Sequence, residues 1–252
     1  QSDAGVGFNY ALDSDTRLGV VMSRYGSDHS YDLAETAARL DTESDAVSLY
    51  FDTRAGAFDL RTRASFAEET HTKATFNEVV GEGSTTTHGG RTVSLSQTAS
   101  TNFRLGRAWL QPWVNLTHTE QQIDGYTISN PFVSDVTYSD GEITDTVASL
   151  GLMATSDAFD LGSDRRLTFT GGFSYSHALR ADDYVVTVEE EALAGLEQTE
   201  RVERDGADVV GLRLGSAFEM GDSLSLSADY TLTKPLGLDV DHALTARFNY
   251  RF

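Results

Sequence analysis

The chain has 252 residues, enough for one barrel or two small globular domains. Its formal charge of −20 argues against nucleic acid as a partner, because phosphate binding needs clustered Lys and Arg. It contains no cysteine, which excludes disulfides and thiolate metal sites. No run of about 18 apolar residues is present, so no transmembrane helix is expected. No basic start leads into an apolar stretch after Gln1, so we expect a processed or truncated piece of a longer protein.

Apolar and polar residues alternate along most of the chain, which is the pattern of β-strands with two unlike faces. In chain order, we expect strands near 6–12, 18–22, 47–54, 58–66, 92–104, 108–119, 144–157, 167–175, 209–218, 224–233 and 244–252. In the last of these, Leu244, Ala246, Phe248, Tyr250 and Phe252 share one face. About eleven strands of roughly ten residues are readable, which is the length of a tilted membrane-spanning strand.

The connections between these strands alternate between short and long. The short ones lie near Asp13–Thr16, Ala55–Ala57, Leu105–Arg107, Asp157–Asp164 and Glu219–Asp222. The long ones lie near Ser27–Glu43, Glu69–Arg91, Glu120–Ile143, Leu179–Gly206 and Lys234–Asp241. Outer-membrane barrels have short periplasmic turns and longer extracellular loops, whereas a soluble sandwich has no reason to segregate loop length. We expect the acidic stretch Glu189–Glu203, within one long connection, to form a short helix because of its Glu, Ala and Leu content.

Charged residues occupy mid-strand positions on the polar face. They are Arg54, Asp59, Arg61, Arg63, Arg213, Asp229 and Arg247. Unpaired, they would cost several kcal/mol each in a dry core, whereas a wet or plugged lumen accommodates them. The alternative is a soluble antiparallel sandwich with its polar face in water. We predict an all-β protein, a transmembrane antiparallel up-and-down β-barrel forming one domain over 1–252, with these charges facing the lumen and paired.

The strand directions predict one more strand than can be read. The strand at 5–12 leads into a short connection, and the last strand also ends on the side of the short connections. Eleven strands would place the first and last parallel, whereas closed bacterial barrels have even strand counts and antiparallel neighbours. We therefore expect twelve strands, with one ascending strand preceding residue 1.

The end of the chain, Phe248-Asn249-Tyr250-Arg251-Phe252, resembles the terminal aromatic signature of bacterial outer-membrane barrels. The resemblance implies that Phe248, Tyr250 and Phe252 form the signal read by the barrel assembly machinery.

Further segments, in this order, resemble the translocator domains of autotransporters, the proteins of type V secretion. They are 7–12 and 15–20 for the early repeat, 107–116 for a strand with aromatic residues around Pro, 123–126 for a following tetrapeptide, and 150–155 with 166–169 for the later hairpin. The resemblance covers nearly the whole chain, and its nearest branch carries a lipase or esterase passenger. It implies a twelve-stranded barrel with a helix through its lumen and a passenger exported to the surface. No helix or first strand is readable before Gly5, so the sequence departs from that pattern at its start.

One pair of motifs suggests a hydrolase. Gly221-Asp222-Ser223-Leu224 and Asp239-Val240-Asp241-His242 spell the nucleophile block and the Asp-x-x-His block of an esterase family. A Ser–His–Asp hydrolase needs its serine within hydrogen-bond reach of the histidine. Here one spanning strand separates the blocks, which would hold them about 25–30 Å apart. We interpret the motifs as coincidental and expect no catalytic residue in this chain.

The six histidines, His29, His71, His88, His118, His177 and His242, lack the spacing of metal ligands, so no metal or other cofactor is expected. The predicted function is an outer-membrane translocator that anchors and exports an N-terminal passenger domain. The alternatives are a small porin or channel, or a barrel-embedded hydrolase. The expected partners are outer-membrane lipid and lipopolysaccharide, the barrel assembly machinery, and the protein's own passenger or a lumen helix.

Overall fold

A computed structural model describes residues 2–33, 36–77, 82–129, 134–162, 164–193, 197–204, 208–221, 223–235 and 240–250. Nearly all of these residues lie in β-strands or tight turns. No helix within these ranges is long and apolar enough to cross a membrane.

Eleven long strands form the wall of the molecule. They are β1 (Ser2–Ala11), β2 (Thr16–Leu33), β3 (Thr36–Ala55), β4 (Phe58–Asn77), β5 (Glu82–Thr101), β7 (Ala108–Ile123), β10 (Gly141–Ser156), β12 (Arg165–Ala181), β15 (Val209–Met220), β16 (Leu224–Pro235) and β17 (Asp241–Tyr250). Two short strands, β6 (Phe103–Leu105) and β11 (Phe159–Asp160), pair with β7 and β12. A separate sheet contains β8 (Tyr126–Ile128), β9 (Val136–Tyr138), β13 (Tyr184–Glu190) and β14 (Glu197–Val202), with a 3-10 turn, η1 (Glu191–Leu193).

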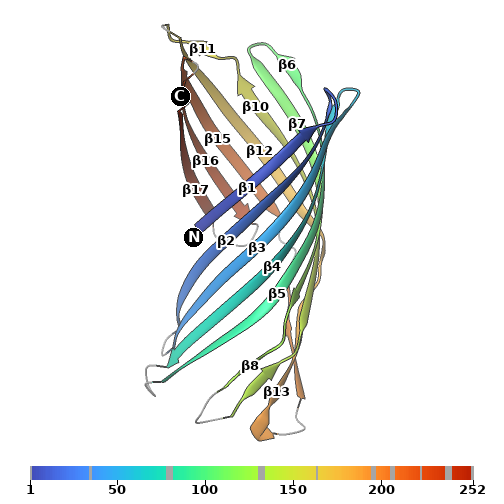
Figure 1. Cartoon of the computed structure of the whole chain (residues 1–252), viewed down its shortest axis with the longest axis vertical. Coiled ribbons are helices and arrows are strands. Elements are labelled where there is room, and N and C mark those ends of the chain that lie inside the picture. Colours follow the sequence, from blue (N-terminus) through green and yellow to red (C-terminus); the bar gives the residue numbers. More distant parts are fainter. Residues whose placement is uncertain are drawn as a thin grey trace.

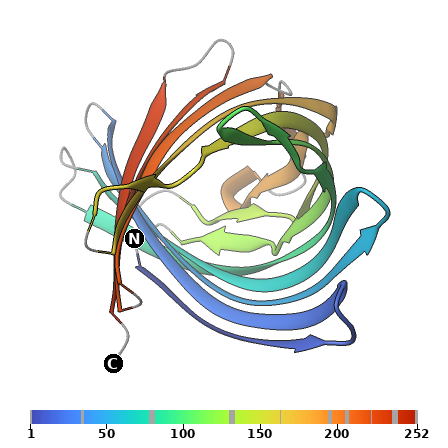
Figure 2. The same ribbon diagram turned by 90° about the horizontal axis from the view of Figure 1, so that it is seen from above.

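The wall strands are joined in chain order, from β1 to β17, and every described pairing is antiparallel. The sheet curls around a central space, so that the strands run obliquely around a barrel (Figures 1 and 2). The expected transmembrane up-and-down barrel is confirmed, as are the eleven strands readable in the sequence. Chain-order pairing leaves no edge between consecutive strands, which is how a sheet satisfies its backbone polar groups in lipid.

The short connections gather at one end of the barrel, here called the short-turn end (Figure 1). Four of them place a glycine at positive φ: Gly56 at 63°, Gly106 at 60°, Gly162 at 78° and Gly221 at 60°. A residue with a Cβ is strained in that conformation, which explains why glycine occupies these tight turns. The short connections are therefore correctly located by the sequence.

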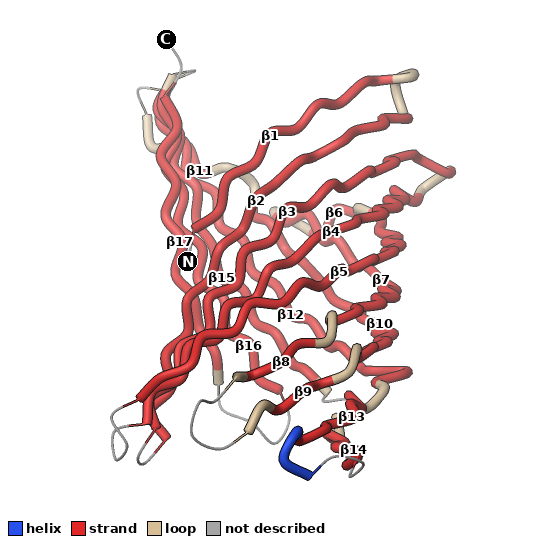
Figure 3. The backbone as a smooth tube through the Cα atoms, turned by 60° about the horizontal axis from the view of Figure 1, so that its bottom comes forward, coloured by secondary structure: helices blue, strands red, loops and turns tan. Residues whose placement is uncertain are grey.

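The long connections are more regular than expected. Ser27–Glu43 and Glu69–Arg91 are not loops, because β2, β3, β4 and β5 continue through their described parts as paired strands. They extend the wall at the opposite end, here called the long-hairpin end (Figure 3). The expected helix at Glu189–Glu203 is also wrong, since its described residues form strands around the 3-10 turn. Outside lipid both faces of a strand meet water, so the apolar alternation that reveals a spanning strand is lost.

The outward face of the wall carries a belt of large apolar side chains. On β4 it runs from Phe58 to Phe66, which are 54% and 43% exposed. That is about 26 Å along the strand, or roughly 20 Å along the axis of a tilted barrel, comparable with the apolar band of outer-membrane barrels. The belt includes the expected outward residues Leu244, Phe248 and Tyr250. It ends where Glu68 and Asp45 pair across β4 and β3, which places the membrane boundary there.

Ten antiparallel pairings separate β1 from β17, so these two strands run in the same direction. The described residues of the long connection 69–91 are divided between β4 and β5, so they supply no additional strand. The twelfth strand beside β1 therefore stays a prediction.

The belt makes a prediction for Leu49 on β3, which is 54% exposed between Val47 and Phe51 on the outward face. Leu49→Arg should lower the free energy of unfolding in lipid vesicles by about 2–4 kcal/mol, because it places a charge near the membrane midplane. The matched control is Thr70→Arg, which lies on the same face but beyond the belt, toward the long-hairpin end. Its expected cost is about 0–1 kcal/mol. Equal costs in urea titrations would contradict the assigned face.

Candidate functional site: the polar lumen wall

Strand register brings polar residues from distant parts of the chain into rows on the inner face. One row passes from Asp52 through Arg61, Thr98 and Asn115 to Ser149. Side chains paired across antiparallel strands point to the same face, so the row follows from the register. Its donors and acceptors interact with one another: Asn115 donates to Thr98 Oγ1 at 2.8 Å.

The β3–β4 part of the wall holds compensated charges. Arg61 donates two hydrogen bonds to Asp52, at 2.6 and 2.8 Å, in a bidentate arrangement. Arg54 donates to Asp59 at 2.9 Å. Arg63 donates to the hydroxyl of Ser48, which is 3% exposed, at 3.0 Å. Bidentate guanidinium–carboxylate pairs fix side-chain orientation as well as neutralising charge.

A second group of charges lies on β15, β16 and β17. Arg213 donates to Asp229 Oδ1 at 3.0 Å through Nε and 2.8 Å through its terminal nitrogen. Arg247 Nη1 lies 3.8 Å from the other oxygen of Asp229. The Asp229 side chain is only 15% exposed and faces both guanidinium groups, so one carboxylate compensates two cations.

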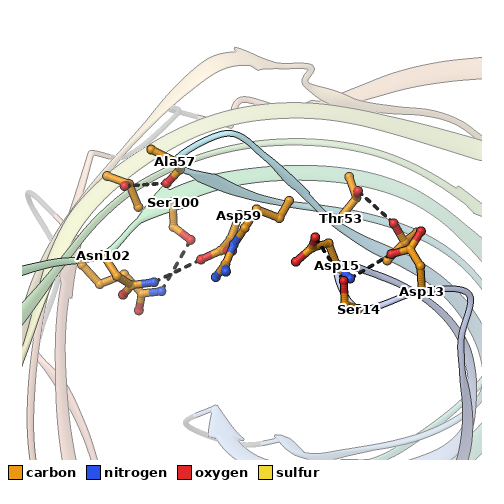
Figure 4. A network of polar contacts seen from close by, with 12 residues as sticks. Asp13, Ser14, Asp15, Thr53, Ala57, Asp59, Ser100 and Asn102 are labelled. Atoms are coloured by element: carbon orange, nitrogen blue, oxygen red, sulfur yellow. Dashed lines mark hydrogen bonds and ion pairs between the residues drawn. The ribbon is translucent and has the colours of Figure 1, made fainter.

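Near the short-turn end, the inner wall encloses a hollow of about 590 Å³. It is lined by both charges and an aromatic ring, including Asp15, Arg17, Asp52, Arg61 and Trp113. Figure 4 shows the side chains of Asp59, Ser100 and Asn102 meeting on the concave side of the wall, where Asn102 donates to Asp59 at 3.1 Å. The lining of the hollow therefore combines carboxylate, guanidinium and apolar groups.

Two glycines on β10 and β12 lie beneath larger inward side chains. Gly151 and Gly172 occupy inward positions, and larger neighbours lie over them. A Cβ at Gly151 would lie 2.6 Å from the ring of Trp113, and one at Gly172 would lie 2.8 Å from the sulfur of Met153. A larger residue at either position would therefore collide with the side chain that lies over it.

All seven charged residues expected in the lumen take part in the contacts described above. The structure adds partners that the sequence did not single out. Asp52 is the clearest of them, and its position on the polar face between Tyr50 and Arg54 was the available signal. Phe248 and Tyr250, which the sequence resemblance marks as parts of an assembly signal, are exposed on the outward face of β17, whereas Phe252 lies outside the described residues.

The hydrolase motifs lie at two ends of one strand. Ser223 is at the exposed turn that precedes β16, and His242 pairs with Leu232 near the other end of β16. Eight strand positions from Leu224 to Leu232 correspond to about 26 Å. Asp222 and Asp239 lie outside the described residues.

Comparison with known proteins gives a consistent result. A family model described as the autotransporter β-domain matches residues 3–231. The fold resembles the translocator domain of the autotransporter NalP from Neisseria meningitidis, with a TM-score of 0.67, 15% identity, and coverage of 99% of this chain and 79% of that chain. It also resembles the β domain of the Bordetella autotransporter BrkA, with a TM-score of 0.54, 12% identity, and coverage of 99% and 97%. No curated protein matches the sequence.

The shared carboxylate of Asp229 predicts an asymmetric response to mutation. Asp229→Asn should lower the free energy of unfolding in lipid vesicles by about 1.5–3 kcal/mol, because it weakens charged hydrogen bonds and leaves two cations uncompensated. Arg247→Gln should cost less than about 1 kcal/mol, since Arg247 is 62% exposed and makes only the longer contact. Urea titrations in which Arg247→Gln is the more damaging change would refute the assignment of Asp229 as the shared partner.

Proposed function

The chain belongs to the autotransporter β-domain family and is an outer-membrane, passenger-translocating barrel, and we propose that its polar lumen wall is the surface along which the N-terminal passenger moves during export. The observation that carries this proposal is the family match over residues 3–231. On this proposal the barrel then anchors the passenger at the cell surface.

The lumen chemistry supports passage of a polypeptide. Its described arginines mostly face carboxylates, as in Arg61 with Asp52 and Arg213 with Asp229, so the wall presents little uncompensated charge to a moving chain. Serine, threonine and asparagine side chains between these pairs can exchange hydrogen bonds with a passing backbone. Such a surface binds many sequences weakly, which suits transport better than tight recognition.

Several finer features belong to the same proposal. The long-hairpin end faces the cell exterior, and the lipopolysaccharide leaflet surrounds the belt there. Phe248, Tyr250 and Phe252 are read by the barrel assembly machinery. A helix from the upstream part of the protein occupies the hollow lined by Asp15, Arg17 and Trp113, whose charges of both signs and aromatic ring could pair with it. The lipase or esterase branch stays a prediction about the passenger alone.

The export test places a tagged reporter domain ahead of the barrel, joined through the sequence that precedes residue 1 in the gene, and adds protease to intact cells. We expect protease to reach the reporter. Ser149→Trp should slow its appearance several-fold, because Ser149 points into the lumen, where it shares a hydrogen bond with Ser176 at 2.8 Å. Leu150→Trp is the matched control, since Leu150 is 52% exposed on the lipid face.

The same test separates the translocator from the porin alternative. A porin would leave the reporter inside the cell and would carry a steady ion current in a planar bilayer with the complete protein. Equal export by the two Trp variants would contradict passage along this inner wall.

We also propose that the barrel has no hydrolase activity of its own. Ser223→Ala should leave ester hydrolysis by the purified barrel unchanged, because about 26 Å separates Ser223 from His242. The measurement is the release of a chromogenic fatty-acid ester product, with heat-unfolded barrel as the blank. Loss of a robust signal in Ser223→Ala alone would show that the motif is functional.

A further inference from the structure

The four-stranded sheet of β8, β9, β13 and β14, here called the mouth sheet, lies at the long-hairpin end of the barrel. Viewed along the barrel in Figure 2, its strands fall inside the ring drawn by the wall, and Figure 3 shows them at the edge of the mouth. It is built from two connections, β7 to β10 and β12 to β15, which join through the β13–β9 pairing. A polypeptide that leaves the lumen at this end therefore passes beside this sheet.

The mouth sheet is fixed to the wall strand β10 by charged and backbone hydrogen bonds. Arg204, just after β14, donates to both carboxylate oxygens of Asp145, at 3.0 and 2.9 Å. Asp182, just before β13, donates its N–H to the carbonyl of Thr144 at 3.0 Å. Bidentate pairs of this kind fix orientation as well as position. The start of β13 and the end of β14 are therefore held in place against the wall.

The mouth sheet turns its apolar face to the wall. The ring of Tyr184 on β13 covers Gly141 of β10, and Tyr126 on β8 stacks on His88 of β5 with ring centroids 4.4 Å apart. Between these contacts lies Val186, which is 4% exposed. Strand register places Tyr126, Tyr184 and Val186 on one face of the sheet, so the alternate residues point away from the wall.

The face that points away from the wall carries one threonine from each of the four strands. They are Thr127, Thr137, Thr187 and Thr199, of which the first two share a hydrogen bond at 3.0 Å and the last two are register partners. This face continues the hydroxyl-rich surface of β5 and β7 inside the lumen. The polar path for a moving chain thus extends from the lumen onto the mouth sheet.

Strand β14 forms one edge of the mouth sheet. It pairs with β13 on one side, and within the described residues no strand pairs with its other side. All six of its residues are exposed. An edge of this kind presents backbone donors and acceptors that can pair with another extended chain.

The backbone groups that point to this free edge can be identified from contacts one strand away. Ser139, after β9, donates its N–H to the carbonyl of Thr187 at 2.9 Å, and the N–H of Thr187 donates to Ser139 Oγ at 3.0 Å. Successive strand residues direct their backbone groups to opposite sides, so those of Val186 and Val188 point to β14. Because Thr187 is the register partner of Thr199, the N–H and C=O of Thr199 point to the free edge.

We propose that the free edge of β14 is a docking edge for the passenger as it leaves the lumen, and that an extended passenger segment adds to the mouth sheet as a further strand. The inference rests on the proposed function, because its partner is the exported chain. Backbone groups make the contacts, so the edge accepts many sequences. Each hydrogen bond contributes modestly, so a docked segment is released as export proceeds.

The passenger fits this edge better than a second copy of the barrel. The edge strand carries the charged side chains of Glu197, Glu200 and Arg201, and charges on an edge strand oppose pairing between folded sheets. A chain emerging from the lumen is already held beside the edge, which gives it a high effective concentration. The ion pair of Arg204 with Asp145 keeps the edge ordered before docking, so less freedom is lost on binding.

The first test maps cross-links in the full barrel joined to its reporter. The reporter carries a tightly folded, cysteine-free domain that is too wide for the lumen, so export stops with a segment in the mouth. The barrel has no cysteine, so Thr199→Cys supplies a unique thiol, and single cysteines are scanned along the reporter segment. Side chains of a paired strand alternate between faces, so we expect disulfides at every second reporter position. Thr187→Cys, one strand further in on the same face, is the matched control and should cross-link several-fold less.

The second test removes one donor from the edge and measures export of a reporter without the wide domain. Thr199→Pro lacks the N–H that points outward, and it should slow the arrival of the reporter at the surface several-fold. Thr199→Val keeps the N–H and should export at the rate of the unmodified barrel. Hydrogen exchange of the Val186 and Val188 amides checks that the β13–β14 pairing survives. Where Thr199→Pro loosens that pairing, the cross-link pattern decides, because it leaves every backbone N–H in place.

The outcomes separate this inference from the proposed function. Equal cross-linking at consecutive reporter positions would overturn the docking edge and leave the translocator function standing. Export by Thr199→Pro at the rate of Thr199→Val, with the β13–β14 pairing intact, would do the same. A reporter that never reaches the surface with the unmodified barrel would overturn both. Barrel dimers joined through Thr199→Cys without a reporter would assign the edge to a second copy and overturn the proposal.

Discussion

The structure depends on one constraint: within lipid, no backbone N–H or C=O can be left without a hydrogen-bond partner. Chain-order antiparallel pairing meets this constraint for the wall strands between β1 and β17, and only the outer edges of β1 and β17 lack a paired strand among the described residues. Once the backbone is satisfied in this way, the period of two along each strand sorts side chains into a lipid face and a lumen face. The apolar belt and the polar rows are thus two consequences of a single backbone arrangement.

The lumen shows how a membrane protein can hold charge without a large energetic penalty. Arg61 with Asp52, and Arg213 with Asp229, are partly exposed pairs rather than isolated ions, so water and a partner share the cost of desolvation. Several of these ion pairs join neighbouring strands, so they also help to hold those strands in register. The same pairing leaves a surface that is polar while most of its arginines face carboxylates.

The spanning strands could be predicted from the sequence because lipid demands strict alternation, as in Leu244 to Tyr250. The extensions of β2 to β5 could not, because water on both faces removes that signal and leaves threonine-rich segments that resemble loops. The seven lumen charges were predicted from their faces, but their partners depend on register. The stack of His88 on Tyr126 joins residues 38 positions apart, and only the folded arrangement of two long connections brings them together.

The extended hairpins give the barrel an uneven height. On β4 the residues beyond Glu68 continue for about nine positions, or roughly 30 Å along the strand. β16 and β17 have no extension of this kind in their described residues, since they comprise 12 and 10 residues. The rim of the long-hairpin end is therefore high where β4 lies and low where β16 and β17 lie. A polypeptide leaving the lumen would contact the extended strands on one side and only solvent on the other, so it would leave the barrel toward the low side of the rim.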